Sequence, residues 1–587
     1  MRPGVGAQLD FEALDRFRKE QLTYWGFQLQ DQANRVFILS LDGATFDVLG
    51  PLVRQGYMPN LGRVLDSGLS AELESVIPPV TAPAWTSFMT GKNPNKHGIF
   101  DFTRFDDIEY KWKLNNSQHI RSKTIWQILS EHGKRIVVLN LPYMYPTYEV
   151  NGVIVAGWDA PTTSSFTYPE QVGREIYELI PDYGLGLDLS LWNYLPAESD
   201  AEFDQFILRL VRSFEQSAML ASHFLRKQEW DVFMVHFQQT DWIQHKLWRY
   251  IERACNDPGD KNPRLERVRE CYRSFDRQVG RLLEEVSPLD PIRIILSDHG
   301  FGRNYGTICP NYILRELGYY HLKPQADGRV KRSFKDSRHS VVRNMYQTLR
   351  AAKDAIQGRK ALKKYRSWAD MANETIPTQK TNVDWSRTKA GFVTGSEVGF
   401  IYINIKGRGP YGLVEPGAEY DQVLAHLIAE FRTLRNGITG EPLFARVVAG
   451  SEIYVGAASD IRLPDLVLVP AEGYVVGAGL AQPLLTSDGE KGDHRHNGVL
   501  LLQGPGIRTT VTNLHPKLID LAPTILHSVG VPVPRDMDGK VLEQVFVSSP
   551  PIHFETVDNS RFSSGRDYSP KDSDLIEQRL RGLGYVD

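Results

Sequence analysis

Three aspartates stand just behind short apolar runs of the sequence. Asp42, Asp241 and Asp298 each come within four residues of the end of such a run. If the runs are parallel strands, their carboxyl ends meet at one edge of a sheet, which is where ligands bind in open parallel sheets. Three carboxylates gathered there would repel each other unless a cation lay between them. The spacing therefore predicts a divalent metal site at that edge.

Histidines accompany these aspartates. Asp241 and His245 are four residues apart, so a helix that starts here places both side chains on one face. His299 directly follows Asp298, and the late segment 492–498 supplies further imidazoles. Mixed carboxylate and imidazole ligands suit Zn²⁺ or Mn²⁺ better than Mg²⁺ or Ca²⁺, which prefer oxygen alone. Two such ions about 4 Å apart would suit displacement at phosphorus.

A hydroxyl nucleophile is expected near the start of a helix. The segment 78–87 (PPVTAPAWTS) places Thr81 just before a helix that a proline would initiate. The free N–H groups of that helix start favour an anion, and metal coordination would deprotonate the hydroxyl near neutral pH. Taken alone, Thr81 is more typical of a helix N-cap than of a nucleophile.

The elements that would position these groups alternate between strands and helices. The apolar runs expected to form buried strands are 35–41, 135–140, 153–156, 231–237, 292–296, 400–404, 465–469 and 499–502. The helical stretches between them are 122–129, 200–227, 263–286 and 515–529. This alternation predicts a layered α/β fold with a mostly parallel sheet.

The segment 303–397 interrupts this rhythm. Its part 331–366 holds twelve Lys or Arg against two Asp, which predicts a basic helical insertion. Two interpretations stay open for it: a solvated helical face or lid, and a docking surface for an anionic partner or a phosphorylated substrate. We expect five parts along the chain: an N-terminal helical extension (1–34), the first part of the core (35–302), the insertion (303–397), the second part of the core (398–548) and a polar tail with a terminal helix (549–587).

Composition narrows the class of protein. The chain has 587 residues, and its 68 basic and 71 acidic side chains give a net charge of −3. That near balance argues against a protein that binds nucleic acid or a membrane surface as a whole. Its three cysteines are too few for a disulfide scaffold. No apolar run reaches the roughly 18 residues of a membrane span, and the start lacks an apolar signal-peptide core. We therefore expect a cytoplasmic protein without a transmembrane segment.

Several short motifs, in this order, resemble the alkaline phosphatase superfamily in its type I phosphodiesterase/nucleotide pyrophosphatase branch. They are Leu41-Asp42-Gly43, 58–61 (MPNL), 81–87 (TAPAWTS), Thr240-Asp241 with His245, 297–300 (SDHG), 492–494 (GDH) and 522–526 (APTIL). The resemblance runs from about residue 35 to residue 542, and the insertion is its least familiar part. It implies a three-layer αβα sandwich with a mostly parallel central sheet and a helical cap.

The resemblance also implies two sets of metal ligands for Zn²⁺ or Mn²⁺. The ligands of one ion would be Asp42, Asp298 and His299, with Thr81 bridging toward it, and those of the other would be Asp241, His245 and His494. His496 competes with His494, which is preferred because its Gly-x-His spacing matches the family.

The same resemblance implies a phosphodiesterase that acts on a phosphate ester through a covalent step. Thr81 would attack phosphorus and form a phospho-threonine, which is then released to water or to an acceptor alcohol. Arg408 would hold a substrate phosphate, and a turn arginine in a solvated loop is an equally good interpretation of that residue.

Four other classes of protein are alternatives to a hydrolase. A phosphomutase or phosphotransferase would use the same ions and hydroxyl inside a pocket that excludes water. A catalytically dead binding protein would be expected to lack some ligands, yet all seven positions carry competent side chains. A sulfatase would need Cys or Ser in place of Thr81, and Arg in place of Trp85. The first apolar run is not followed by the Gly-x-Gly-x-x-Gly turn of dinucleotide-binding proteins. Hydrolysis of a phosphate diester is the favoured function.

Overall fold

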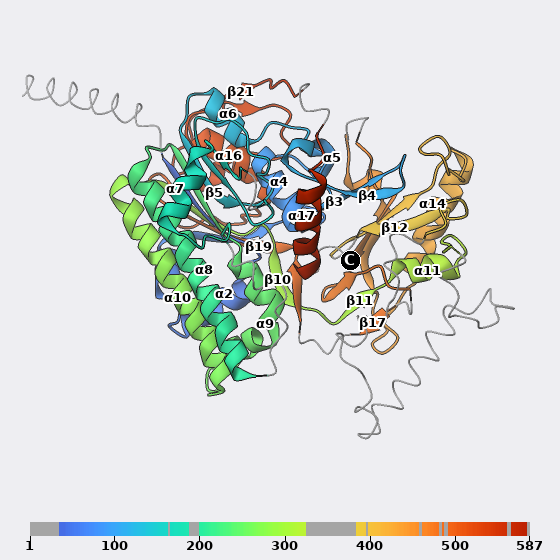
Figure 1. Cartoon of the computed structure of the whole chain (residues 1–587), viewed down its shortest axis with the longest axis horizontal. Helices are drawn as coiled ribbons and strands as arrows, with labels where there is room; N and C mark the ends of the chain where they lie inside the picture. Colours follow the sequence, from blue (N-terminus) through green and yellow to red (C-terminus); the bar gives the residue numbers. More distant parts are fainter. Residues whose placement is uncertain are drawn as a thin grey trace, which may run out of the picture.

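The computed structural model shows two bodies that lie side by side, each with its own sheet (Figure 1). The described residues are 35–161, 165–186, 199–323, 383–394, 397–456, 461–480, 484–486, 491–559 and 565–583. The helix predicted in residues 1–34 and the basic segment 331–366 lie outside them.

An eight-stranded sheet forms the centre of the larger body. From edge to edge its strands are β2 (Leu69–Glu74), β19 (Asn497–Gln503), β9 (Ile292–Leu296), β1 (Val36–Leu41), β8 (Val232–Phe237), β5 (Ile136–Leu141), β6 (Gly152–Ala156) and β7 (Thr167–Tyr168). The strands from β9 to β6 are parallel, whereas β19 runs against β9 and β7 against β6. Every residue of β1, β5 and β8 is buried, as expected for parallel strands covered on both faces. The predicted α/β class with a mostly parallel sheet is confirmed.

Two groups of helices cover this sheet and complete three layers (Figure 1). The first group contains α8 (Asp200–Lys227), α9 (Gln239–Asn256) and α10 (Pro263–Val286), and the second contains α4 (Thr81–Thr90), α6 (Ile125–Glu131) and α16 (Leu521–Ser528). The ends of the long helices follow from local chemistry. The N–H of Glu202 donates to the N-cap Ser199 of α8 at 3.3 Å, and Pro263 opens α10 behind the N-cap Asn262.

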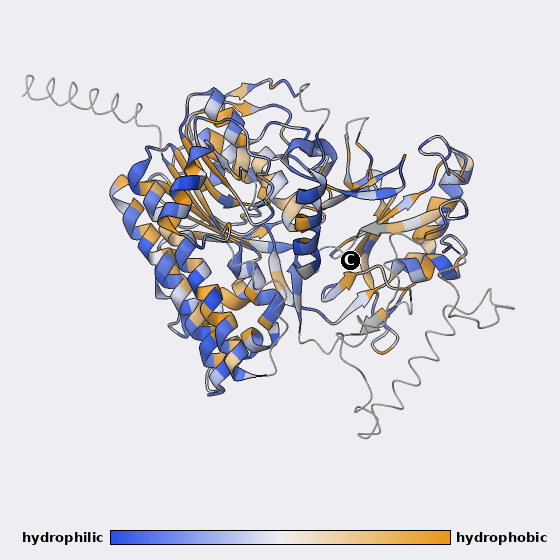
Figure 2. Cartoon of the chain, in the orientation of Figure 1, coloured by the Kyte–Doolittle hydropathy of each residue, from blue (hydrophilic) through white to orange (hydrophobic). Residues whose placement is uncertain are grey.

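A four-stranded antiparallel sheet organises the smaller body. Its strands, in order, are β12 (Ala390–Thr394), β13 (Gly399–Ile403), β15 (Leu466–Pro470) and β14 (Phe444–Ala449). Apolar residues line both sheets (Figure 2), and the helices α11 (Pro310–Glu316) and α14 (Ala418–Arg432) pack on this second core. The runs 400–404 and 465–469, predicted as strands of the parallel sheet, lie here instead. The segment 398–548 therefore contributes to both bodies.

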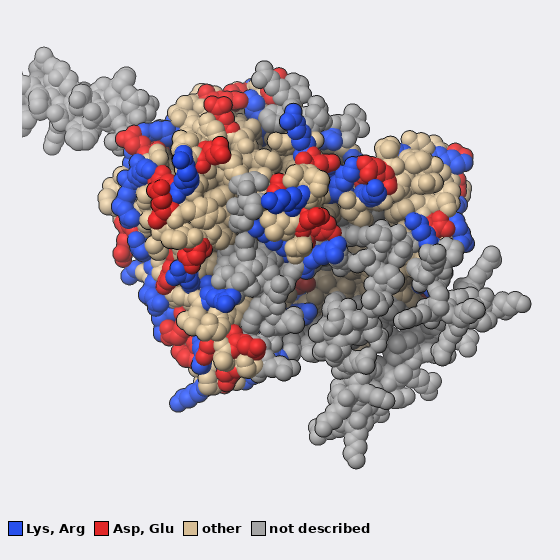
Figure 3. Space-filling model, viewed as in Figure 1, with Lys and Arg blue, Asp and Glu red and all other residues tan. Residues whose placement is uncertain are grey.

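The polar tail returns to the larger body. Its terminal helix α17 (Pro570–Leu583) buries Ile576 and Leu580, and the guanidinium of Arg579 donates to the carbonyl of Trp158 at 2.9 Å. Figure 1 shows this helix in front of the junction of the two bodies. Within the described ranges, no helix is both long and apolar enough to cross a membrane. Basic and acidic side chains are interspersed over the face seen in Figure 3.

Candidate metal centre

The three predicted aspartates come from three neighbouring strands. β1 lies between β9 and β8, and all three strands run parallel. Asp42 follows the last residue of β1, Asp241 lies in the first turn of α9 just after β8, and Asp298 follows β9 by two residues. The sheet therefore brings the three carboxylates to one edge, as the strand pattern predicts.

Asp42, Asp298 and His299 form a first group of side chains whose atoms nearly touch. Nε2 of His299 lies 3.5 Å from Oδ1 of Asp42 and 3.4 Å from Oδ2 of Asp298. All three side chains are fully buried. These three atoms make no hydrogen bond within the part of the chain that the structure describes. Three converging, buried acceptor atoms without donors are the arrangement expected of a cation site.

Asp241, His245 and His494 form a second group that is more compact. Oδ1 of Asp241 lies 3.3 Å from Nε2 of His245 and 3.3 Å from Nε2 of His494, and these two nitrogens are 3.0 Å apart. Ligand atoms held about 2.0–2.1 Å from a tetrahedral ion would be separated by about 3.3 Å. The donor set thus fits Zn²⁺ in spacing and in chemistry, and imidazole and carboxylate also suit Mn²⁺.

The two groups are adjacent. The imidazole rings of His299 and His494 stack with centroids 3.7 Å apart and planes 22° from parallel. Asp241, His299 and His494 also present atoms that all lie within 4.8 Å of one another. A third combination within the same reach contains His245, Asp493 and His494. The sequence order leaves these residues far apart, and the fold makes them one cluster.

Burial controls the protonation of the first group, which contains Asp42, Asp298 and His299. Burial, together with the carboxylate of Asp298, raises the pKa of Asp42 well above its ordinary value. Burial also raises the pKa of Asp298 to about 8. The pKa of His299 is well below its ordinary value, again because of burial, so its imidazole is neutral and able to bind a metal. Divalent cations would allow the carboxylates to ionise at neutral pH.

Thr81 is the first residue of α4 and is fully buried. The sequence predicted it just before a helix, whereas the N-cap is Val80, which offers no side-chain cap. One turn along the helix, the indole N–H of Trp85 donates to Oδ2 of Asp42 at 2.9 Å. Before the helix, the carbonyl of Pro79 lies 3.2 Å from Nδ1 of His494. These two contacts bracket Thr81 between a residue of the first group and a residue of the second.

Backbone geometry holds the strand ends in place. Thr240 Oγ1 donates to the carbonyl of Asp42 at 2.7 Å, and Gln244 Nε2 donates to the carbonyl of Gly43 at 2.8 Å. Gly43 has φ +65°, and a Cβ there would lie 3.2 Å from Oδ1 of Asp241 and 3.3 Å from Cε1 of His299. The glycine therefore permits both the turn and the close approach of the two groups.

Glu397 is a residue of the site that sequence reasoning missed. Its Oε1 lies 2.9 Å from Nδ1 of His494, and its side chain is 4% exposed. A carboxylate behind a histidine fixes which ring nitrogen faces the metal. Glu397 stands just before β13 of the smaller body, so this body reaches into the cluster of the larger one. No spacing in the sequence marks it.

The two remaining candidates pair with carboxylates that do not belong to the cluster. His496 has a 40% exposed side chain, and its Nε2 lies 3.8 Å from Glu74, at the outer edge of the sheet. Arg408 pairs with Asp465 at 3.1 Å, and both residues belong to the smaller body. The predicted residues brought together are Asp42, Asp241, His245, Asp298, His299 and His494, and Thr81 lies in the chain between Pro79 and Trp85, which contact this cluster.

A comparison with known protein families shows to which family the chain belongs. The family model described as type I phosphodiesterase/nucleotide pyrophosphatase matches residues 36–498. The chain therefore belongs to this family of phosphoric ester hydrolases.

Solved structures that resemble the chain include the following two. Phosphonoacetate hydrolase from Sinorhizobium meliloti 1021, in complex with phosphonoacetate, is 14% identical, with 85% of this chain and 96% of that chain covered and a TM-score of 0.49. Human ectonucleotide pyrophosphatase/phosphodiesterase 5 is also 14% identical, with 88% and 100% covered and a TM-score of 0.45.

Proposed function

We propose that this protein is a phosphodiesterase that uses two divalent ions, Zn²⁺ or Mn²⁺, and Thr81 as its nucleophile. One observation carries the proposal: two groups of ligand atoms, with separations of 3.0–3.5 Å within each, share one buried cluster beside the start of α4. Family membership supports phosphoric ester hydrolysis independently of this geometry.

The chain offers one set of residues for each ion. Asp42, Asp298 and His299 would hold the first, and the second would be held by Asp241, His245 and His494. When bound, such ions lower the pKa of a coordinated hydroxyl and neutralise charge on phosphoryl oxygens. Glu397 would keep Nε2 of His494 directed at the site by accepting a hydrogen bond from its Nδ1.

Thr81 and the first turn of α4 have separate roles in the covalent step. Thr81 Oγ1 forms a bond to phosphorus while the P–O bond to the leaving alcohol breaks. The threonine loses its hydroxyl proton and the leaving alkoxide gains one, so charge balances. The first N–H groups of α4 point along the helix axis toward its start, where an anion is favoured. The phosphorus on Thr81 still carries the second ester group, so water that cleaves its bond to Oγ1 releases a phosphate monoester and restores the hydroxyl.

Hydrolysis of bis-(p-nitrophenyl) phosphate and of p-nitrophenyl phosphate, each with Zn²⁺ or Mn²⁺, tests this proposal. We expect the diester to be the better substrate, and we expect Thr81→Ala to abolish its turnover. Thr90→Ala is the matched control, because Thr90 lies at the other end of α4 and its hydroxyl donates to the carbonyl of Thr86 at 2.8 Å. Full activity of Thr81→Ala would eliminate this nucleophile.

The same assay separates hydrolysis from phosphoryl transfer. A phosphomutase or phosphotransferase would hold metal and form a phospho-threonine, yet release little product to water. Metal analysis and mass spectrometry of the protein after incubation with the diester distinguish the two. If the phosphoryl group leaves Thr81 only when an alcohol is added, the protein is a transferase and not a hydrolase.

A further inference from the structure

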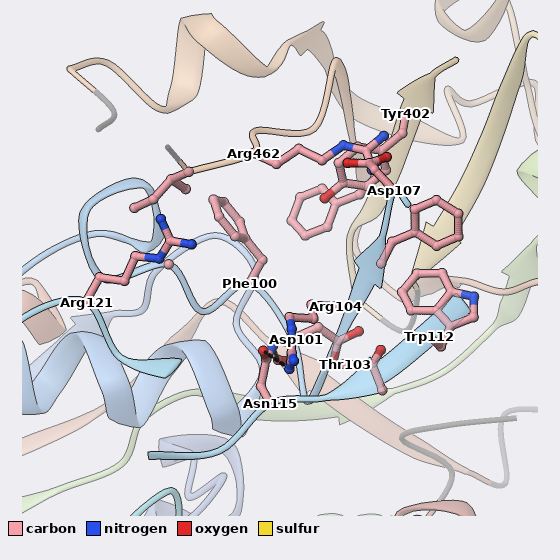
Figure 4. A pocket seen from close by; sticks show the side chains of 14 residues that line it. Phe100, Asp101, Thr103, Arg104, Asp107, Trp112, Asn115, Arg121, Tyr402 and Arg462 are labelled. Carbon is pink, nitrogen blue, oxygen red and sulfur yellow. Dashed lines mark hydrogen bonds and ion pairs between the residues drawn. The ribbon is translucent and has the colours of Figure 1, made fainter. Parts of the chain in front are cut away.

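A cavity of about 190 Å³ lies between the two bodies (Figure 4). Two of the arginines that line it are paired, Arg462 with Asp107 and Arg104 with Asp567. Among the described residues of its lining, none belongs to the cluster of the metal centre. Buried polar side chains that do contact the cluster lie at the carboxyl edge of the central sheet.

Gln238 is a buried side chain at this edge. It is the N-cap residue of α9, directly after β8, and is 2% exposed. Its amide lies 2.8 Å from Nε1 of Trp158, which follows β6 by two residues, and 3.0 Å from Nε2 of His236 in β8. It also lies 3.3 Å from Oδ2 of Asp241. Because all four side chains are buried, their polar atoms depend on one another for hydrogen bonds.

The partners of Gln238 determine how its amide is oriented. The indole N–H of Trp158 can only donate, so the atom that it meets must be the amide oxygen, Oε1. The amide nitrogen, Nε2, therefore faces Asp241 and donates to its Oδ2. Since Oε1 is an acceptor, Nε2 of His236 carries a proton, and Nδ1 of the neutral imidazole accepts from the hydroxyl of Ser40 at 3.0 Å. These hydrogen bonds form one network that includes a residue of the second group of ligands.

The imidazole of His236 also reaches the first group of ligands. Its Nε2 lies 3.4 Å from Oδ2 of Asp42, and its ring meets that of Trp85 edge to face, with 5.0 Å between centroids. The indole N–H of Trp85 donates to the same oxygen of Asp42 at 2.9 Å. Ser40 and His236 are opposite each other on β1 and β8, so the register of the sheet places this imidazole beside Asp42.

The network contacts the same oxygen of both aspartates. It contacts Oδ2 of Asp42 and Oδ2 of Asp241, whereas the histidines of the cluster lie 3.3–3.5 Å from Oδ1 of each. A hydrogen bond to one oxygen of a carboxylate limits its rotation and so fixes the direction of the other oxygen. Gln238, directly and through His236, can therefore orient one carboxylate in each group of ligands.

We propose that Gln238 is a positioning residue of the metal centre, which keeps Oδ1 of Asp241 directed at one ion and, through His236, Oδ1 of Asp42 directed at the other. It acts on the ligands and not on the substrate. The inference rests on the proposed two-ion site and goes beyond it, because it couples the ligands of both ions through one side chain.

Gln238→Met tests this role, because it keeps the length of the side chain and removes both polar atoms. We expect both Zn²⁺ ions to bind more weakly, and one of them by about 10–100-fold, as is typical when a hydrogen-bond partner of a metal ligand is lost. Competition with a graded chelator measures the two binding steps. Trp158→Phe leaves Gln238 in place but removes the donor that orients its amide, so it should weaken Zn²⁺ binding by a smaller factor. If Gln238→Met does not fold, unchanged affinity in Trp158→Phe would overturn the inference.

Gln239→Met is the matched control. Gln239 is the next residue in the chain and is also buried, but its amide nitrogen donates to the carbonyl of Gly186 at 2.6 Å and to Ser213 and Ser217 of α8. This control should bind both ions as the wild type does, whatever its free energy of unfolding in chelator. If Gln238→Met is less stable in chelator but keeps wild-type affinity for both ions, Gln238 only supports the fold and the inference is wrong. An equal loss of affinity in the two variants would also overturn it.

Hydrolysis of bis-(p-nitrophenyl) phosphate keeps this inference distinct from the proposed function. If the wild type binds two ions but hydrolyses no diester, the phosphodiesterase proposal fails by itself, and the affinities still decide the role of Gln238. If it does hydrolyse the diester, the activity of Gln238→Met should be low at limiting Zn²⁺ and rise as Zn²⁺ is added, whereas Thr81→Ala should stay inactive. A wild type that binds no ion would overturn both proposals.

Discussion

At the scale of single residues, Glu397 joins the cluster to the smaller body. Its carboxylate and the imidazole of His494 are both buried and lie 2.9 Å apart. Loss of such a carboxylate typically weakens metal binding 10–100-fold. We expect Glu397→Ala to lower the affinity of the protein for Zn²⁺ by this factor, and Glu397→Gln, which still accepts a hydrogen bond, to lower it less.

Competition of the protein with a graded chelator measures this affinity. Glu441→Ala is the matched control, because Glu441 is exposed in the same body. If Glu397→Ala retains metal as firmly as the control, Glu397 does not position His494.

Asp159 gives a pH dependence that is separate from the metal centre. Burial raises its pKa to about 6, and one of its oxygens accepts the N–H of Tyr143 at 2.8 Å. An unfolded aspartate has a pKa of about 3.9, so folding disfavours the ionised form. The resulting destabilisation is present above about pH 6 and disappears below about pH 4. It amounts to about 3 kcal/mol, from a shift of about two units.

The free energy of unfolding of the wild type, compared with Asp159→Asn, should therefore fall by about 3 kcal/mol as the pH rises from about 4 to about 6.5. Urea denaturation at a series of pH values measures this difference. A difference that does not vary with pH would show that Asp159 is not the titrating group.

Much of the cluster could be predicted from the residues themselves. Asp42 and Asp298 follow largely apolar strands, so their position at the sheet edge follows from the strand pattern. Spacing alone left His494 and His496 as alternatives, and the structure buries the first and exposes the second. Glu397 could not be found, because it belongs to another body and no nearby motif marks its role.

At the scale of elements, the sequence pattern predicts strands better than it predicts their partners. The runs at β13 and β15 are as apolar as those of the parallel sheet, because both sheets are buried. Their assignment to an antiparallel sheet depends on long-range pairing, which a local pattern does not contain. The helices at 200–227 and 263–286 were predicted to the residue, since caps and a proline mark their ends.

The terminal helix α17 gives a prediction at this scale. Leu580 is 1% exposed and Ile576 is 3% exposed, and both pack into the main core. Replacing a buried leucine by alanine costs about 2–5 kcal/mol. A helix of 14 residues is marginal by itself, so Leu580→Ala should release α17 and leave the rest folded.

Amide hydrogen exchange measures this release. Exchange in residues 570–583 should accelerate in Leu580→Ala while exchange in α16 stays slow. Gln578→Ala, at an exposed position of the same helix, should change neither. Unchanged protection of α17 in Leu580→Ala would mean that other contacts hold the helix.

At the scale of the whole molecule, the candidate metal centre couples charge to stability. Asp42 and Asp298 are fully buried, and their raised pKa values mean that folding opposes the ionisation of these two carboxyl groups when no cation is bound. We expect chelation to lower the Tm, and added Zn²⁺ or Mn²⁺ to raise it with concentration. Activity toward the diester should disappear on chelation and return when metal is added, in parallel with the change in Tm.

In this experiment we expect the Tm of Asp298→Asn to differ from that of the wild type in opposite directions with chelator and with metal. It removes one of the two carboxyl groups whose ionisation folding opposes, so its Tm in chelator at neutral pH should be higher than that of the wild type. It also removes a proposed metal ligand, so its Tm should respond less to added metal. A variant that is less stable than the wild type in both conditions would mean that burial of the Asp298 carboxyl does not oppose folding.

The position of β19 has a consequence for how the protein is made. β2 pairs with the rest of the central sheet only through β19, and Asn497 meets Glu72 across 425 residues of sequence. Ribosomes add about 5–20 residues per second, so β2 waits for its neighbour for on the order of a minute. During that time β2, and later also β9 once it has been made, present open edges to other chains. Synthesis of this enzyme should therefore depend on chaperones until residue 503 has left the ribosome.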